Sequence, residues 1–174
     1  MSKDVKLLIR KRYITTILIV IFFNIFYAVN AFGEAETKVE DYTINVQYSE
    51  SEKLVLDLIN KQREEEGLSK LKFDSRLMKL AKLKTDDMLE ENYISHNSDK
   101  YGNVFNMLKV NSINYKMAGE NIARNANETL AVQAWMNSTS HRENILEERY
   151  EYTGISVVKD KEYGYLFVEI FMEI

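Results

Sequence analysis

The sequence predicts an α+β domain of the three-layer type, in which a central, mainly antiparallel sheet lies between two layers of helices. Three observations indicate this class. Helical spacing of apolar residues prevails in the middle of the chain, and period-two spacing replaces it from residue 152 onwards. The last β-rich run is apolar on both of its faces. A strand of that kind needs cover on both sides, and the preceding helices can supply it.

The first 31 residues have the features of an export signal. Five Lys and Arg residues precede position 13, residues 13–33 carry no charge, and small residues end at Ala31, after which cleavage is expected. This uncharged run would also span a bilayer about 30 Å thick, which leaves an uncleaved anchor as the alternative. In both cases the rest of the chain is expected to be secreted or extracytoplasmic. Membrane contact is then expected only through residues 13–33.

The exported part is acidic and lacks cysteine. Without residues 1–31, 18 Lys and Arg face 26 Asp and Glu, which gives a net charge of −8. Nucleic acid is not expected as a partner, because it binds to basic surfaces. The absence of cysteine excludes disulfides, thiol catalysis and thiolate metal sites. We expect a monomer that is stabilised by its core alone.

A polar linker and then a helix are predicted at the start of the exported part. Residues 32–48 are acidic and without periodicity, which is typical of a linker before a domain at 49–174. Ser49 and Glu52 have the spacing of a capping box, and the helix that they begin is expected to end at Gly67. Its predicted inner face carries Leu54, Val55, Leu58 and Ile59.

Two further helices and a short ordered segment follow. Asp74 is the predicted N-cap of a helix that ends near Asn92, which places His96 in the next loop. The predicted inner face of this helix carries Leu77, Met78, Ala81, Met88 and Leu89. A shorter helix is expected from Asn103. Residues 115–127, "YKMAGENIARNAN", are too polar for a long helix and predict a short strand or an ordered loop.

The second histidine lies between a helix and the hairpin that ends the chain. Residues 128–136 are helical in pattern, with Leu130, Ala131, Ala134 and Trp135 on one face. Ser140 and Glu143 again have capping-box spacing, so a helical turn is expected there with His141 at its first position.

The remaining residues predict an antiparallel hairpin, with runs 153–160 and 163–174 separated by "KDKEYG". The second run is expected at the centre of the sheet. One of its faces carries Leu166, Val168, Ile170 and Met172, and the other carries Tyr165, Phe167 and Phe171.

Conventional catalytic motifs are absent from the sequence, which has no H-E-x-x-H, G-x-S-x-G or phosphate-binding loop. His96, His141 and Glu120, the last within the apolar stretch "AGENIA", are the remaining candidates. A carboxylate in such a stretch should be partly desolvated and should need a partner. Two imidazoles and one carboxylate are a ligand set for zinc. On spacing alone, a hydrogen-bonded structural role for each histidine is the favoured interpretation.

Five motifs in a fixed order give the chain a family resemblance: "YISH", "YKMAGENIA", "AVQAWMNSTSHRENIL", "YTGISVV" and "YGYLFVEIF". Over residues 52–172 the chain resembles the CAP domain of cysteine-rich secretory proteins, antigen 5 and plant pathogenesis-related proteins, in its short bacterial branch. The resemblance implies an α-β-α sandwich with a cleft of two histidines and two acids, which binds a divalent metal in some members. It places the histidines at His96 and His141 and the first acid at Glu120. The second acid falls on Ser138, which weakens the expectation of a tight metal site.

Three functions remain open from the sequence. The first, and the favoured one, is a non-enzymatic exported protein that binds a small ligand, a peptide or a cell-wall component through a cleft at His96, Glu120, His141 and Ser138. The second is a structural component of the envelope or of a spore layer. The third is a metal-assisted hydrolase or peptidase in which Glu120 acts as a base on water. Zinc, held by His96, His141 and Glu120, is the cofactor that the resemblance allows.

Overall fold

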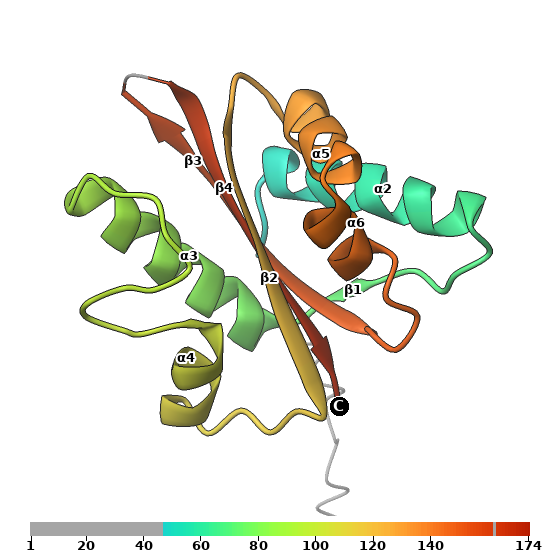
Figure 1. Cartoon of the computed structure of the whole chain (residues 1–174), viewed down its shortest axis with the longest axis horizontal. Coiled ribbons are helices and arrows are strands. Elements are labelled where there is room, and N and C mark those ends of the chain that lie inside the picture. The colour runs from blue at the N-terminus through green and yellow to red at the C-terminus, as the bar shows by residue number, and fades with distance from the viewer. Residues whose placement is uncertain (1–46, 162) are drawn as a thin grey trace, which may run out of the picture. The chain divides into compact units, whose positions relative to one another are not determined.

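The computed structural model describes residues 47–161 and 163–174, and in it a four-stranded sheet of order β1-β3-β4-β2 lies between two layers of helices (Figure 1). One face of the sheet is covered by α3 (Ser75–Glu90) and α4 (Val104–Val110). The other is covered by α2 (Glu50–Glu65), α5 (Glu128–Asn137) and α6 (Thr139–Ile145). The strands are β1 (Lys72–Phe73), β2 (Met117–Asn125), β3 (Tyr152–Asp160) and β4 (Gly164–Glu173). The predicted three-layer fold is confirmed.

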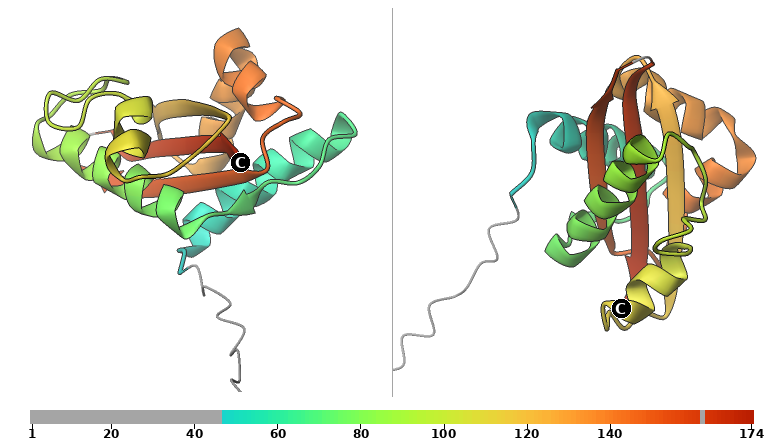
Figure 2. Two further views of the ribbon diagram at one scale, coloured as in Figure 1. Left: turned by 90° about the horizontal axis from the view of Figure 1, so that it is seen from below. Right: turned by 90° about the vertical axis from the view of Figure 1, so that its left-hand side faces the viewer.

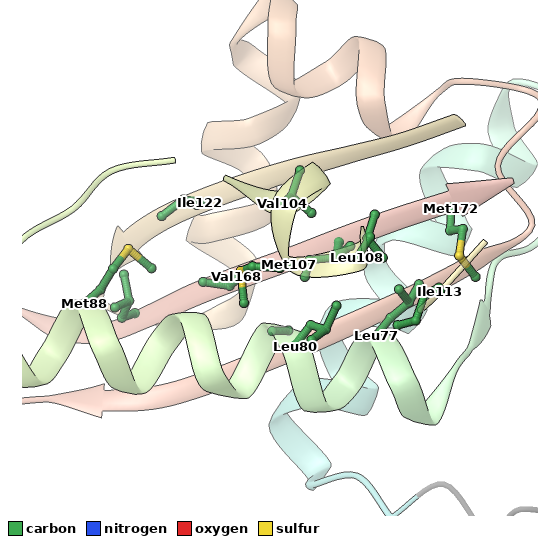
Figure 3. Packing of buried hydrophobic residues seen from close by; sticks show 13 residues of the cluster. Leu77, Leu80, Met88, Val104, Met107, Leu108, Ile113, Ile122, Val168 and Met172 are labelled. Atoms are coloured by element: carbon green, nitrogen blue, oxygen red, sulfur yellow. The ribbon is translucent and has the colours of Figure 1, made fainter. Parts of the chain in front are cut away.

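The hairpin and the central strand are also confirmed. β4 pairs antiparallel with both β3 and β2, so it lies inside the sheet with neighbours on both edges. Its alternating side chains enter two separate core clusters, one on each face, as the sequence predicts. Figure 3 shows the cluster beneath α3 and α4, where Val168 and Met172 of β4 meet side chains of both helices. β1, which pairs parallel with β3, was not predicted, because two residues carry no periodic signal.

The segment 115–127 forms a strand rather than a loop. β2 contains nine of its residues and pairs along its whole length with β4. Since β2 is the last strand in the sheet order, one of its edges has no partner strand among the described residues. β2 also hydrogen-bonds to both histidine-bearing segments, through Glu120 and Asn121.

Both long helices begin where the sequence predicts. Ser49 Oγ accepts a hydrogen bond from the backbone N–H of Glu52 at 3.2 Å, and the Glu52 carboxylate accepts one from Ser49 N at 2.7 Å, which completes the capping box of α2. Asp74 caps α3 by accepting from two backbone N–H groups of its first turn. Each helix ends within two residues of its predicted end. Capping residues therefore located these helices reliably.

The predicted inner faces of α2 and α5 are partly wrong. Leu54 and Leu130 are each 43% exposed, and Ala134 is also exposed. Leu56 and Val132, which were not predicted to be inside, are buried instead. In both helices apolar residues flank the true face on either side, so the periodicity does not decide which flank contacts the sheet.

α3 lies against the sheet (Figure 2), and it packs directly on strand β3 at Gly154. A Cβ atom at Gly154 would lie 2.1 Å from the backbone carbonyl carbon of Leu77, far inside any allowed contact. Only glycine allows the helix and the strand to approach this closely. The close contact fixes the position of α3. A later turn of this helix carries Lys84, which contacts the loop that contains His96.

The predicted export signal or anchor at 1–31 lies outside the described residues, as does nearly all of the predicted linker at 32–48. The described residues, 47–161 and 163–174, belong to one compact unit. Among the helices of the described part of the chain, none has the length and apolar character needed to cross a bilayer.

Candidate functional site

The candidate site is built around the free edge of β2, where successive side chains point to opposite faces of the sheet. Glu120 lies on the face covered by α3 and α4, because its second neighbours Ala118 and Ile122 belong to that core cluster. Asn121 lies on the other face, with α5 and α6. One strand thus supplies a polar side chain to each of the two histidine-bearing segments.

On the first face, Glu120 holds His96. Oε1 of the carboxylate lies 2.7 Å from Nδ1 of the imidazole. The Glu120 side chain is only 3% exposed, whereas that of His96 is 59% exposed. The hydrogen bond to Glu120 raises the pKa of His96, and partial burial of the ring opposes this. A carboxylate only accepts, so the neutral ring donates from Nδ1 and its Nε2 lone pair is left for another partner.

A buried lysine supports this pair from beneath. Lys84 of α3 has no exposed surface, and its Nζ donates to the main-chain carbonyl oxygen of His96 at 2.8 Å. Burial lowers the pKa of the Lys84 ammonium, and the nearby carboxylates of Glu120 and Asp87 oppose this effect. The second Glu120 oxygen, Oε2, is buried and accepts no hydrogen bond from the described residues. The positive charge of Lys84 compensates for that missing bond.

On the second face, His141 lies in α6, and the predicted start of this helix is wrong. Thr139 is its first residue and Ser138 is its N-cap, so His141 is the third residue of the helix rather than the first. Ser138 ends α5 and begins α6 at the same time, which leaves no room for a separate cap at Ser140. Its Oγ makes no capping bond to the backbone and instead lies 2.9 Å from Nδ1 of His141.

The main chain of His141 is held by Asn121, whose Nδ2 donates to the His141 carbonyl oxygen at 3.0 Å. Asn144, one turn later in the helix, donates to Asn121 Oδ1 at 2.9 Å. Partial burial lowers the pKa of His141, and the positive charge of His96 lowers it further. Burial and the neighbouring His96 thus both disfavour the charged form of His141.

Arg63 fixes the chain that follows α6, and the sequence analysis missed it. Its guanidinium is fully buried and donates to four carbonyl oxygens, namely those of Ser69, Ile145, Glu147 and Tyr150, at 2.7 to 3.2 Å. A signal was present, because Arg63 follows Val55 and Ile59 at helical spacing and so lies on the buried face of α2.

The four predicted site residues thus come together as two pairs. His96 pairs with Glu120, and His141 pairs with Ser138. The cleft that the resemblance implies at these residues stays a prediction. A pocket of about 630 Å³ lies beside the end of α3 and the loop that carries His96. Its lining consists of Asp87, Glu91, Tyr93, Asn97, Asp99 and Lys100, and does not include the two histidines.

The predicted metal site at His96, His141 and Glu120 stays a prediction, and the geometry shows which atoms are available to it. No group of three or more His, Asp or Glu side chains within residues 47–161 and 163–174 is placed to hold a metal ion. Glu120 has one oxygen bonded to His96 and the other buried, so the nitrogens left for a metal are Nε2 of His96 and Nε2 of His141. Zinc sites in proteins have three or four protein ligands. Glu120 instead occupies the orienting position that carboxylates take behind a histidine ligand.

Comparison with known proteins assigns the chain to a protein family. The model of the cysteine-rich secretory protein (CAP) family matches residues 56–171. Two proteins of Bacillus subtilis strain 168 are similar in sequence. The uncharacterized protein YkwD is 43% identical over 109 residues, and the uncharacterized membrane protein YlbC is 40% identical over 114 residues. These matches cover 62% and 65% of the chain, and 42% and 32% of the two relatives. The chain therefore matches less than half of the length of these curated relatives.

A solved structure supports the fold. The crystal structure of an extracellular SCP-domain protein from Bacillus anthracis superposes with a TM-score of 0.64 at 28% sequence identity. The superposition covers 71% of this chain and 40% of the other. The α-β-α layers described above are therefore those of a known bacterial SCP-domain structure.

Proposed function

The chain belongs to the cysteine-rich secretory protein (CAP) family, and on this premise we propose that it is an exported binding domain. It captures a cell-wall component at the site formed by His96, Glu120, His141 and Ser138. The binding function is non-enzymatic, and the cell wall is the proposed partner because it is the structure that an exported envelope protein meets outside the membrane.

One observation carries the proposal, namely the contrast in exposure within the His96–Glu120 pair. The carboxylate is 3% exposed and the imidazole to which it is bonded is 59% exposed. A buried carboxylate needs a hydrogen-bond partner, and the partner here is a ring that stays largely in solvent, where a ligand can reach it. Here a buried acid fixes the orientation of an exposed ring, which is how a protein prepares a binding group for a ligand.

Export is supported from two directions. The first 31 residues have the basic head and apolar body of an export signal. The similar protein of Bacillus anthracis is described as extracellular, and YlbC is described as a membrane protein. Both descriptions suit a protein that faces the outside of the cytoplasmic membrane, whether residues 13–33 are cleaved or retained as an anchor.

A hydrolase in which Glu120 is the base is less well supported. A base must reach the proton that it removes, either directly or through one water. Glu120 Oε1 is bonded to His96, and Oε2 has no contact with solvent. The carboxylate is therefore placed to orient the imidazole, and we derive no catalytic step from it.

Binding to peptidoglycan tests the proposal. Full-length protein, in detergent where residues 13–33 are retained, is sedimented with peptidoglycan sacculi purified from Bacillus subtilis. The His96→Ala/His141→Ala double variant should bind about tenfold more weakly or worse, as expected when central contacts are lost. The matched control is Lys82→Ala/Asp86→Ala, which removes an exposed ion pair of α3 and should bind like the wild type. Equal binding by the double variant, or no binding by the wild type, would contradict the proposal.

A further inference from the structure

We propose that Lys84 is a positioning residue of this site, whose buried ammonium group holds the main chain of His96 and so sets the imidazole against Glu120. The inference rests on the proposed function for its biological meaning, but the geometry that carries it does not depend on any ligand. It assigns a role to a residue that lies in the hydrophobic layer beneath the site rather than at its surface.

The position of Lys84 in α3 is the first argument. Leu77, Leu80, Ala81 and Met88 form the inner stripe of this helix, and Lys84 falls on the same stripe at helical spacing. An apolar side chain would suit this position better, because burying an ammonium group costs several kcal/mol unless it is paired. Lys84 is nevertheless completely buried. A charge at such a position needs a function that an apolar residue cannot perform.

The bond that Lys84 makes is the second argument. Nζ donates to the carbonyl oxygen of His96 at 2.8 Å, and this is the one hydrogen bond to the main chain of His96 within the described residues. The loop is otherwise anchored on either side of His96, by Tyr93, whose hydroxyl donates to Asp87, and by Ser98, which pairs with Gly102. The peptide that carries the exposed imidazole is therefore held by Lys84.

The second histidine is held in the same manner, which is the third argument. Asn121 is fully buried and donates to the carbonyl oxygen of His141 at 3.0 Å. Each histidine thus has its main chain held by a buried side-chain donor and its Nδ1 held by a side-chain oxygen, from Glu120 or Ser138. In two separate segments the histidine is therefore held both at its main chain and at its ring. This arrangement indicates that the bonds orient the rings and do not only stabilise the fold.

The electrostatics agree with this role. Glu120 and Asp87 lie near enough to Lys84 to favour its charged form, yet neither forms an ion pair with it within 4.0 Å among the described residues. The ammonium therefore directs its hydrogen bond to the loop carbonyl while its charge compensates for two buried carboxylates. A neutral side chain of similar length would fill the space but would release the loop.

The tautomer of His96 provides the test, because a merely stabilising residue would not change it in the folded protein. Full-length protein is labelled with ¹⁵N, and the imidazole nitrogens are observed at a pH above the end of the His96 titration measured on the same sample, so that both rings are neutral. In the wild type His96 should carry its proton on Nδ1. The variant Lys84→Met should show a mixture of the two tautomers, whereas Lys82→Met, on the exposed face of the same helix, should match the wild type. An unchanged tautomer in folded Lys84→Met would overturn the proposal.

If Lys84→Met does not fold, a measurement on the wild-type protein tests the proposal instead. The Lys84 ammonium protons should exchange slowly and should give cross-peaks to protons of His96 and Asn97. Absence of these signals would overturn the proposal. The sacculus assay separates this inference from the proposed function. A tautomer change in Lys84→Met supports the positioning role even where wild-type protein does not bind sacculi, and an unchanged tautomer rejects it even where binding is tight.

Discussion

Glu120 and His96 share a hydrogen bond of 2.7 Å, yet the acid is almost fully buried and the imidazole is more exposed than not. The pair spans two unrelated segments, since Glu120 belongs to β2 and His96 to the loop after α3. The ring of a loop residue can adopt many orientations. Because the buried carboxylate already restricts the His96 ring, less conformational entropy is lost when a ligand binds.

Replacing Glu120 by Gln should lower the pKa of His96. The carboxylate favours the charged imidazolium by accepting its Nδ1 proton, and a neutral amide gives less support. The stabilisation that this bond gives the fold is present in acid and is lost as the pH rises through the pKa of His96. NMR titration of the imidazole C–H protons measures the shift. Glu143→Gln, which changes an exposed acid of α6, is the control and should leave the pKa of His96 in place.

The surroundings of a second buried acid, Glu169, favour its protonated, neutral form. Its side chain is completely buried, and burial raises its pKa to about 8. The hydroxyl of Thr153 lies 3.1 Å from Glu169 Oε1 and 3.0 Å from the carbonyl oxygen of Ile170. One hydroxyl proton cannot serve both acceptors fully. Both contacts are satisfied when Glu169 is protonated and donates to Thr153, which then donates to Ile170.

The folded protein should therefore lose stability as the pH rises towards 8. The folded state keeps the Glu169 proton that the unfolded state releases near the ordinary pKa of 4.5, so stability is fully present below that value and declines up to about 8. Melting temperatures across this range should fall for the wild type and fall less for Glu169→Gln. Glu151→Gln, at an exposed position, should keep the wild-type slope. Parallel curves for the wild type and Glu169→Gln would show that Glu169 is ionised in the fold.

Zinc binding by the full-length protein should depend on the two histidines and much less on Glu120. Because Nδ1 of each ring is hydrogen-bonded, Nε2 of each ring is the nitrogen available to a metal ion. Glu120 orients the His96 ring through its Nδ1. In calorimetric titrations His96→Ala and His141→Ala should each abolish any zinc binding, and Glu120→Gln should weaken it by about 10- to 100-fold. Complete loss in Glu120→Gln, equal to that in the histidine variants, would make the carboxylate a direct ligand.

The two N-cap serines should respond differently to substitution. Ser49→Ala breaks a complete capping box and should cost about 1 kcal/mol of folding free energy. Ser138→Ala removes no bond to the backbone of α6, because its Oγ is engaged with His141, and should cost less than about half as much. Urea unfolding of both variants measures the difference. A larger loss for Ser138→Ala would mean that its hydroxyl caps the helix in solution.

Local signals in the sequence were sufficient for most of the fold. The capping residues Ser49 and Asp74 located two helices, and the two apolar faces of β4 placed it at the centre of the sheet with helices on both sides. The start of α6 was wrong because Ser138 and Ser140 are equally able to cap a helix, and the choice between them depends on where α5 ends. Local pattern does not contain that tertiary information.

The candidate site was only partly predictable for a related reason. His96, His141 and Glu120 were found by residue type and local sequence, and the family resemblance joined them across the sequence and added Ser138. Lys84 and Asn121 were missed because their residue types ordinarily mark exposed positions, although Lys84 shares the helical spacing of the buried face of α3. Their roles follow from long-range hydrogen bonds to main-chain carbonyls, which no spacing rule predicts.

The central claim is that the two histidines act together in one binding site. The most direct measurement is a double-mutant cycle of affinity for peptidoglycan sacculi, with wild-type protein, His96→Ala, His141→Ala and the double variant. Each single variant should weaken binding by about tenfold, and the double variant should lose clearly less than the product of the two losses, because groups that share a ligand are coupled. Single variants that bind within about twofold of the wild type, or losses that simply multiply, would contradict the account.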